Sequence, residues 1–154
     1  LLTFSEMLRY QLYDCNSNII NIEKEMKYIK NYVALQKERR DDTLVINLSI
    51  DENMKGFSIA PLLFIAFIEN SFKYVGSSEE TENCIDISVK KENDVLHFKC
   101  YNTKEKNFKN NIEHKGIGIN NAKRRLQLLY ADKNELEIND AENFYEVNLK
   151  IQLS

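Results

Sequence analysis

The stretch from Pro61 to Val75 constrains the fold most, because it is apolar over more residues than one strand can hold. Almost every position from Ile59 to Phe72 is apolar, which predicts a helix over 59–74 that is buried on most of its sides. Polar side chains are costly to bury without partners. Three of them interrupt this stretch: Glu69, Asn70 and Lys73.

These three residues span one helical turn, so their side chains can meet a common ligand. The amide oxygen of Asn70 can bind Mg²⁺ and the ammonium of Lys73 can contact phosphate oxygens, which points to a nucleotide. The simpler alternative is a surface pair of Glu69 and Lys73 at a helix end, with Asn70 capping a backbone group. This segment alone does not separate the two interpretations.

A second polar segment begins at Gly116, where two of the chain's four glycines stand one residue apart. Apolar residues recur at helical spacing after Gly118, which predicts a helix over 119–130. Glycine allows close approach of the backbone, and free N–H groups at a helix start attract phosphate. A glycine pair before a helix is common, and it gains weight here from the polar helix upstream.

Most of the remaining chain alternates apolar and polar residues. The alternation predicts strands at 43–50, 84–90, 94–102, 134–139 and 143–153. Helices are predicted at 1–14 and 21–39. Each strand has one apolar face, so one side of the sheet must be covered by helices and the other must face water. The predicted fold class is an α/β (α+β) two-layer sandwich, preceded by N-terminal helices.

Composition indicates one compact domain of 154 residues with a net charge of −3, which argues against nucleic acid as a partner. The three cysteines are Cys15, Cys84 and Cys100, without Cys-x-x-Cys spacing, so neither a disulfide framework nor a zinc site is predicted. Cys84 and Cys100 are expected to be core thiols. No apolar run has membrane-spanning length, and no signal peptide is visible.

Together these segments resemble the ATP-binding domain of sensor histidine kinases, and in particular the LytS-type sensor kinases. The resemblance covers nearly the whole chain, and the order and spacing of its motifs agree throughout. The matching segments are Phe4-Ser-Glu-Met-Leu-Arg-Tyr-Gln-Leu12, Ile22-Glu-Lys-Glu25 with Tyr28, Ile29 and Tyr32, Pro61 with Glu69-Asn-Ser-Phe-Lys-Tyr74, and Gly116-Ile-Gly-Ile-Asn-Asn-Ala-Lys-Arg-Arg-Leu126. The resemblance implies a Bergerat-type ATP-binding fold, whose mixed, mostly antiparallel sheet carries helices on one face.

The resemblance also implies Mg²⁺ and ATP as cofactors, with the γ-phosphate passing to a histidine. Residue by residue, it makes Asn70 the metal ligand and Glu69 the catalytic residue that polarises the incoming histidine or orients a metal-bound water. The nucleotide-binding residues that it implies are Asn70, Lys73, Tyr74, Asn102, Gly116, Ile117, Gly118, Asn121 and Arg125. Among these, Asn102 stands for the adenine-binding aspartate, and Arg125 helps to hold the lid or the phosphate. Residues 103–115 are expected to form the ATP lid.

The adenine loop departs from the family's pattern. The superfamily's Asp-x-Gly-x-Gly is replaced by Asn102-Thr-Lys-Glu-Lys, and His114 stands at the first glycine of the Gly-x-Gly-x-Gly run. An amide oxygen accepts a weaker hydrogen bond from the adenine amine than a carboxylate does. Nucleotide binding is therefore expected to survive with weakened affinity. The alternative is a degenerate pseudokinase that acts as a dimeric interaction module without productive ATP binding.

The resemblance divides the chain into 1–40, the C-terminal helices of the dimerisation and phosphotransfer region, and 41–154, the ATP-binding catalytic domain. It implies a homodimer through the N-terminal helices, a response regulator of the LytTR type, and a cytoplasmic position in a bacterial plasma-membrane sensor. The family's phosphoacceptor histidine lies in a His-Phe-x-Phe-Asn segment, which this sequence lacks. The chain is therefore expected to be a fragment of a protein-histidine kinase that cannot phosphorylate itself.

Overall fold

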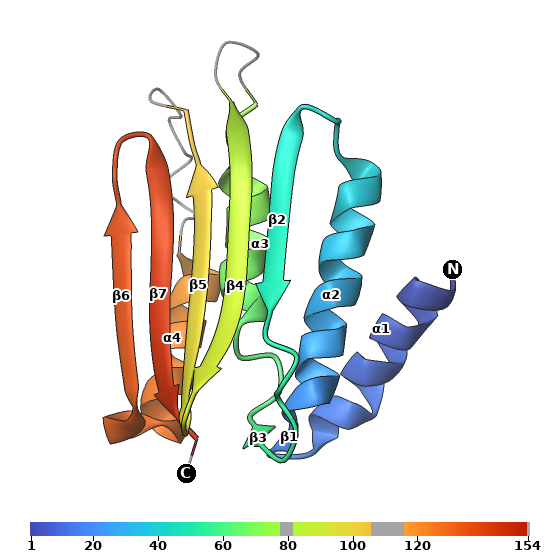
Figure 1. The fold of residues 1–154 in the computed structure, drawn as a ribbon, viewed down its shortest axis with the longest axis vertical. Coiled ribbons are helices and arrows are strands. Elements are labelled where there is room, and N and C mark those ends of the chain that lie inside the picture. Colours follow the sequence, from blue (N-terminus) through green and yellow to red (C-terminus); the bar gives the residue numbers. More distant parts are fainter. Residues whose placement is uncertain (78–81, 106–115, 154) are drawn as a thin grey trace.

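A five-stranded sheet forms one layer of the molecule (Figure 1). The computed structural model describes residues 1–77, 82–105 and 116–153. In spatial order the strands are β2 (Leu44–Ile50), β4 (Asn83–Glu92), β5 (Val95–Thr103), β7 (Phe144–Gln152) and β6 (Asn134–Asp140). β2 and β4 run parallel, whereas the other neighbouring pairs are antiparallel. The sheet is therefore mixed and mostly antiparallel, as expected.

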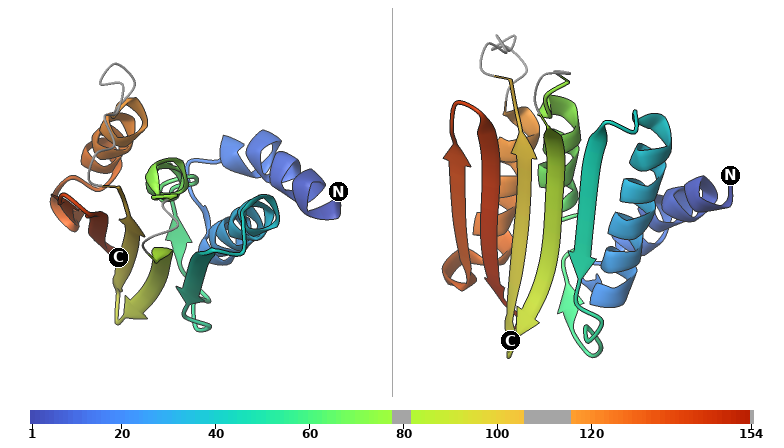
Figure 2. Two further views of the ribbon diagram at one scale, coloured as in Figure 1. Left: turned by 90° about the horizontal axis from the view of Figure 1, so that it is seen from above. Right: turned by 45° about the horizontal axis from the view of Figure 1, so that its top comes forward.

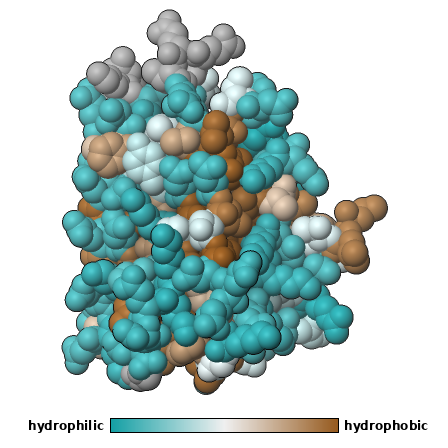
Figure 3. Space-filling model, viewed as in Figure 1, coloured by the Kyte–Doolittle hydropathy of each residue, from teal (hydrophilic) through white to brown (hydrophobic). Residues whose placement is uncertain are grey.

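Helices cover one face of this sheet, as the view from above in Figure 2 shows. They are α2 (Ile22–Arg39), α3 (Ile65–Tyr74) and α4 (Ile117–Leu129). The helix α1 (Leu2–Leu12) packs against α2 and lies farther from the sheet. The opposite face of the sheet is mainly hydrophilic (Figure 3). The two-layer α/β sandwich with one covered face is thereby confirmed.

The core between the two layers is built around Phe98 of β5. Its ring stacks on Phe64 at 4.7 Å between centroids and lies 6.1 Å from the ring of Phe67. All three rings are buried. Because Phe64 and Phe67 belong to the start of α3, these aromatic contacts fix that helix against the middle of the sheet.

The apolar stretch after Ile59 is not one continuous helix, so the prediction of a helix over 59–74 is wrong in its first part. Ser58–Ile59 form the short strand β3, which pairs with β1 (Ile20–Asn21). A turn follows in which Leu62 has φ +58, a left-handed conformation that an α-helix excludes. The helix α3 begins only at Ile65. An apolar run shows burial, but its length alone does not show where a helix starts.

The other predicted elements are confirmed, with ends that differ by at most two residues. Among the residues that the structure describes, short 3₁₀ helices lie at Asp14–Asn16 and Ala131–Lys133. Cys100 is buried as expected, whereas Cys84 is half-exposed. The prediction for Cys84 is wrong because Ile85 and Ile87 of the same strand point into the core, so their neighbour points away from it. Within the described ranges, no helix combines the length and apolarity needed to cross a membrane.

Candidate functional site

A cavity of about 250 Å³ lies between the C-terminal half of α3 and the start of α4. The two helices pack against each other above the sheet. Five separate segments of the chain contribute to the lining, so the cavity exists only in the folded domain. The described lining residues are Asn70, Tyr74, Lys104, Gly116, Ile119, Asn120, Lys123, Asp140 and Tyr145.

Three of the predicted nucleotide-binding residues line this cavity: Asn70, Tyr74 and Gly116. Asn70 and Tyr74 lie one helical turn apart on α3, and Gly116 caps the start of α4. The next two predicted residues, Ile117 and Gly118, form the exposed first turn of α4. The first backbone N–H groups of a helix have no partner within it. The fold therefore brings the two polar segments of the sequence together.

Glu69 and Lys73 are exposed, so the expectation that all three polar residues of α3 are buried is wrong for these two. Asn70 is half-buried. The reason is that α3 buries the face carrying Ile68, Ser71 and Phe72, among others, whereas Glu69 and Lys73 lie on its other side. The Lys73 ammonium lies 5.3 Å from the ring centroid of Tyr74. Partial burial still raises the pKa of the Glu69 carboxyl.

Asn102 is fully buried on β5, between Ile85 of β4 and Tyr145 of β7. Its Nδ2 donates to the Thr103 carbonyl at 3.1 Å, whereas its Oδ1 accepts no hydrogen bond from the described residues. A buried acceptor without a donor is costly. Tyr145 lines the cavity, so this unsatisfied oxygen belongs to a residue next to the cavity wall.

Arg125 and Asn121 lie outside the described lining of the cavity. The Arg125 guanidinium donates to the carbonyls of Leu62 at 3.0 Å and Pro61 at 2.8 Å, so it holds the turn before α3. Asn121 is exposed, and its neighbour Asn120 lines the cavity instead.

Sequence reasoning missed several lining residues. The Lys104 ammonium forms an ion pair with the Asp140 carboxylate, and both belong to the lining. Burial, with the negative charge of Asp140 as the next cause, raises the pKa of Tyr145 to about 12, so its phenol stays a neutral donor. Strand alternation placed Tyr145 on the inner face but gave no sign of a cavity there. The sequence around Lys104 and Lys123 does not distinguish these two lysines from ordinary surface residues.

The predicted lid falls mostly outside the described residues, since 106–115 and His114 within them are not described. The start of that segment is tied to the end of α3. The Gly76 amide donates to the Thr103 carbonyl at 3.0 Å, and the Ser77 amide donates to the Glu105 carboxylate at 2.8 Å. The lid itself stays a prediction.

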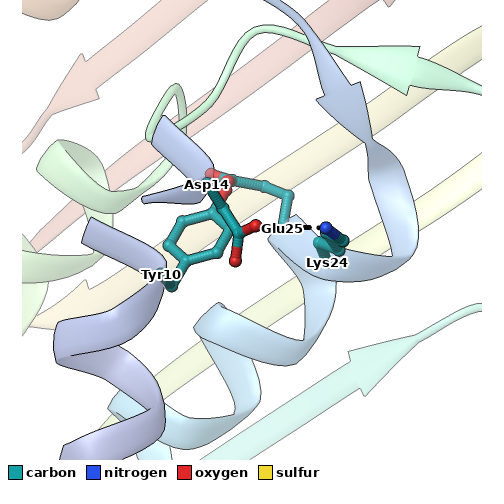
Figure 4. Close-up of polar contacts among 4 residues, drawn as sticks. All are labelled: Tyr10, Asp14, Lys24 and Glu25. Atoms are coloured by element: carbon teal, nitrogen blue, oxygen red, sulfur yellow. Dashed lines mark hydrogen bonds and ion pairs between the residues drawn. The ribbon is translucent and has the colours of Figure 1, made fainter. Parts of the chain in front are cut away.

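A second polar cluster is buried under the turn before α3. Glu25 of α2 is fully buried, and its Oε2 accepts hydrogen bonds from the Tyr10 hydroxyl and, at 3.1 Å, from the Leu62 amide. Figure 4 shows the side chains of Tyr10 and Glu25 directed toward each other. Burial raises the pKa of the Glu25 carboxyl, although the Tyr10 hydrogen bond, the backbone donors and Arg125 act in the opposite direction. The sequence contained these residues within motif segments but gave no sign of their contact.

The two glycines of α4 are expected to respond in opposite ways to alanine. Gly116 has φ +107, so Gly116→Ala is expected to destabilise the domain by about 1–2 kcal/mol. Gly118 lies inside the helix with nothing within 4 Å of an added Cβ, so Gly118→Ala is expected to stabilise it by up to about 1 kcal/mol. Urea unfolding of both variants provides the measurement. Equal effects would contradict the assigned backbone conformations.

Comparisons with known proteins relate the chain to histidine kinases. Residues 1–44 match the family model described as histidine kinase. The chain is 29% identical over 96 residues to the sensor protein LytS of Staphylococcus haemolyticus, which covers 62% of this chain and 16% of that protein. It is 30% identical over 89 residues to the sensor protein kinase HptS of Staphylococcus aureus, covering 58% of this chain and 17% of that protein. The matched part thus spans about a sixth of these relatives.

Solved structures share the fold at lower sequence identity. The histidine kinase domain of a blue-light activated histidine kinase from Erythrobacter litoralis superposes with a TM-score of 0.62 and 14% identity, covering 99% of this chain and 80% of that one. The nucleotide-free catalytic domain of the histidine kinase ThkA gives a TM-score of 0.59 at 14% identity, covering 86% and 95% of the two chains. The chain is thus similar in sequence to the LytS-type sensor histidine kinases, and its fold is that of a histidine kinase catalytic domain.

Proposed function

We propose that residues 41–154 are the ATP-binding catalytic domain of a two-component sensor histidine kinase. Residues 1–40 would then be the C-terminal helices of its dimerisation and phosphotransfer region. The observation that supports this proposal is the cavity at which Asn70, Tyr74 and Gly116 meet, because two distant motifs of the kinase family converge there. The domain would donate the γ-phosphate of ATP to a histidine outside this sequence.

The proposed boundary at residue 40 divides the chain by function, although one hydrophobic core extends across it. Ile22, Ile29 and Val33 of α2 are buried in the same core as α3 and the sheet. Of the described helices α1 to α4, α1 lies apart from the covered face of the sheet. In the proposal α1 and α2 both belong to the dimerisation and phosphotransfer region, and α2 connects that region to the core of the catalytic domain.

The lining of the cavity fits Mg²⁺ and a triphosphate in its chemistry. The Asn70 amide oxygen is a hard ligand that Mg²⁺ accepts, and the described residues contain no cluster of three or more His, Cys, Asp or Glu side chains for a metal. Phosphate oxygens and water would therefore complete the coordination. Bound Mg²⁺ supplies charge neutralisation between the phosphates, which together with positioning accounts for most of the catalysis of phosphoryl transfer.

The chain's own groups have separate tasks in this proposal. The backbone amides of Ile117 and Gly118 at the open start of α4 would face the phosphates, as anions bind at helix N-termini. The ammonium groups of Lys73 and Lys123 would add positive charge. Glu69, exposed beside Asn70, would polarise the incoming histidine, and the unsatisfied Oδ1 of Asn102 would accept from the adenine amine.

One observation favours the alternative of a pseudokinase that serves as a dimeric interaction module. The cavity of about 250 Å³ lies below the range of about 300–1,000 Å³ that is usual for ligand pockets. The Lys104–Asp140 ion pair also forms part of its lining, so a ligand has to fit beside that pair or displace it. Weak or absent ATP binding would follow from such a small site.

The proposal extends to partners and location. The exposed apolar residues of α1 are suited to a helix–helix contact in a homodimer: Leu2, Phe4, Leu8 and Leu12. Figure 3 shows exposed hydrophobic side chains at the N-terminal end of the chain. A response regulator of the LytTR type would receive the phosphoryl group. The domain would lie on the cytoplasmic side of a bacterial plasma-membrane sensor.

Calorimetric titration with a non-hydrolysable ATP analogue, with and without Mg²⁺, tests the proposal. The native chain is expected to bind more tightly with Mg²⁺, and Asn70→Ala is expected to abolish that difference. Asn120→Ala, which alters the cavity lining, should weaken binding at least about 5-fold, whereas Gln127→Ala, at an exposed position near the end of α4, should leave it unchanged. Absence of any binding by the native chain would favour the interaction module.

A further inference from the structure

The turn at residues 60–62, just before α3, is held by groups from two other helices and the residue that follows α4. The Ala60 amide donates to the Tyr130 hydroxyl at 3.0 Å, and Arg125 of α4 donates to the carbonyls of Pro61 and Leu62. Glu25 of α2 accepts from the Leu62 amide at 3.1 Å. Leu62 has φ +58, a conformation that a residue with a Cβ keeps only where its surroundings hold it. These hydrogen bonds keep Leu62 in this conformation.

The Glu25 carboxylate is also the point at which α1 reaches this turn. One oxygen, Oε2, accepts from both the Tyr10 hydroxyl and the Leu62 amide, while Oε1 accepts no hydrogen bond from the described residues. Tyr10 is 6% exposed and Glu25 is 0% exposed, so water does not replace either bond. Figure 4 shows that the Tyr10 side chain comes from α1 and the Glu25 side chain from α2. A single buried oxygen atom therefore connects α1 to the segment that starts α3.

This turn is connected to both helices that line the cavity. α3 begins at Ile65, directly after the turn, and carries Asn70 and Tyr74 into the cavity. α4 holds the turn through Arg125 and contributes Gly116 and Lys123 to the same cavity. A shift of Leu62 therefore changes the separation of the two helices between which the nucleotide is proposed to bind.

We propose that Tyr10 and Glu25 are positioning residues that couple the docking of α1 to nucleotide binding between α3 and α4. The coupling rests on the proposed function and adds a route by which the dimerisation region controls it. When the Tyr10 hydroxyl contacts Glu25, the carboxylate is directed at the Leu62 amide and the turn keeps its conformation. When α1 moves away, the carboxylate loses the hydrogen bond from the Tyr10 hydroxyl. The turn and the start of α3 are then held less firmly. Binding couplings are reciprocal, so nucleotide must also stabilise the docked position of α1.

The chain offers a matched pair of variants for the test. Tyr10→Phe removes the hydroxyl that contacts Glu25. Tyr28→Phe removes a hydroxyl at the same interface, because the Tyr28 ring stacks on Tyr10 at 4.7 Å and its hydroxyl accepts from Gln11 of α1 at 2.7 Å. Both tyrosines are buried. The hydrogen bond of the Tyr28 hydroxyl is with the side chain of Gln11 on α1 and not with the turn. Each variant thus loses one hydroxyl at the interface of α1 and α2, and the Tyr10 hydroxyl, unlike that of Tyr28, contacts the carboxylate that accepts from the Leu62 amide.

Two measurements on the full chain decide the question. Amide hydrogen exchange followed by NMR, without nucleotide, should show exchange about 10-fold faster at Leu62 and in the first turn of α3 for Tyr10→Phe, and no change there for Tyr28→Phe. Titration with the Mg²⁺-bound ATP analogue should show affinity at least about 5-fold weaker for Tyr10→Phe and unchanged for Tyr28→Phe. In the native chain, the analogue should slow exchange in α1.

The possible outcomes separate the coupling from the proposed function. Equal affinities for the native chain and Tyr10→Phe, with normal binding in both, would overturn the coupling and leave the proposed function intact. No binding by the native chain would overturn both. Equal losses in the two variants would show a general effect of α1 docking and overturn the role of Glu25. Should Tyr10→Phe fail to fold, Glu25→Gln replaces it, with the same weakening expected because its neutral amide is a poorer acceptor.

Discussion

Replacing Phe98 with alanine is expected to destabilise the domain by about 3–5 kcal/mol, because the substitution leaves a cavity in a closely packed core. The ring is 1% exposed and stacks on Phe64 at 4.7 Å. It also contacts Phe67, so both aromatic residues at the start of α3 lose their support. Chemical denaturation followed by circular dichroism measures the change. Binding of the ATP analogue should weaken as well, since α3 carries Asn70.

Phe144→Ala is the matched control for this prediction. Phe144 is a half-exposed residue of β7 that stacks on Tyr101 at 5.5 Å. Tyr101 alternates with the buried residues of β5, so this pair lies on the uncovered face of the sheet. The expected cost is about 1 kcal/mol or less, because a cross-strand aromatic pair at the surface contributes little more. Similar losses for the two variants would contradict the assignment of the covered face.

Arg125→Ala is expected to destabilise the domain by about 2–3 kcal/mol. The substitution leaves the carbonyls of Pro61 and Leu62 without their donors and removes a positive charge near the buried Glu25 carboxyl. Thermal and urea unfolding give the measurement. A phosphate-binding role would produce the reverse pattern, with a large loss of nucleotide affinity and little change in the free energy of unfolding.

Arg124→Ala provides the comparison, since Arg124 is the adjacent residue of α4 and is exposed. Its removal should change the free energy of unfolding by no more than about 0.5 kcal/mol. If the two arginine variants are equally stable, the guanidinium does not hold the turn before α3.

Strand alternation carried most of the prediction of the fold. Phe98, Cys100 and Asn102 alternate with polar neighbours on β5. Once one residue of a strand is known to point inward, alternation gives the direction of all the others. The same rule, applied consistently to β4, would have placed Cys84 on the outer face. Alternation shows neither the order of the strands nor the parallel pairing of β2 with β4, and the resemblance to a known family implied only that the sheet is mixed and mostly antiparallel.

The candidate site was predictable where it depends on local segments. Asn70, Tyr74 and Gly116 stand in recognisable motifs, and the fold brings them to one cavity. Lys104 and Asp140 meet because β5, β7 and β6 lie side by side in the sheet. No local sequence pattern predicts this contact. The exposure of Glu69 and Lys73 depends on which side of α3 faces the core, and a nearly continuous apolar run does not show that side. Arg125 was expected to hold the lid or the phosphate because it matches the arginine of the family, and no sequence pattern shows that its guanidinium reaches the carbonyls of Pro61 and Leu62.

The parallel pairing of β2 with β4 has a consequence for how the chain acquires its structure. Leu44 pairs with Asn83, so the edge of the sheet closes only after the intervening β3 and α3 have been made. Contacts between distant segments slow folding, whereas the antiparallel partners β4 and β5 are neighbours that join early. During synthesis, α2 and β2 leave the ribosome before β4, the strand that pairs with β2, has been made. The apolar side of α2 therefore remains exposed until the later strands have been made. We expect chaperones to bind the nascent chain at this stage.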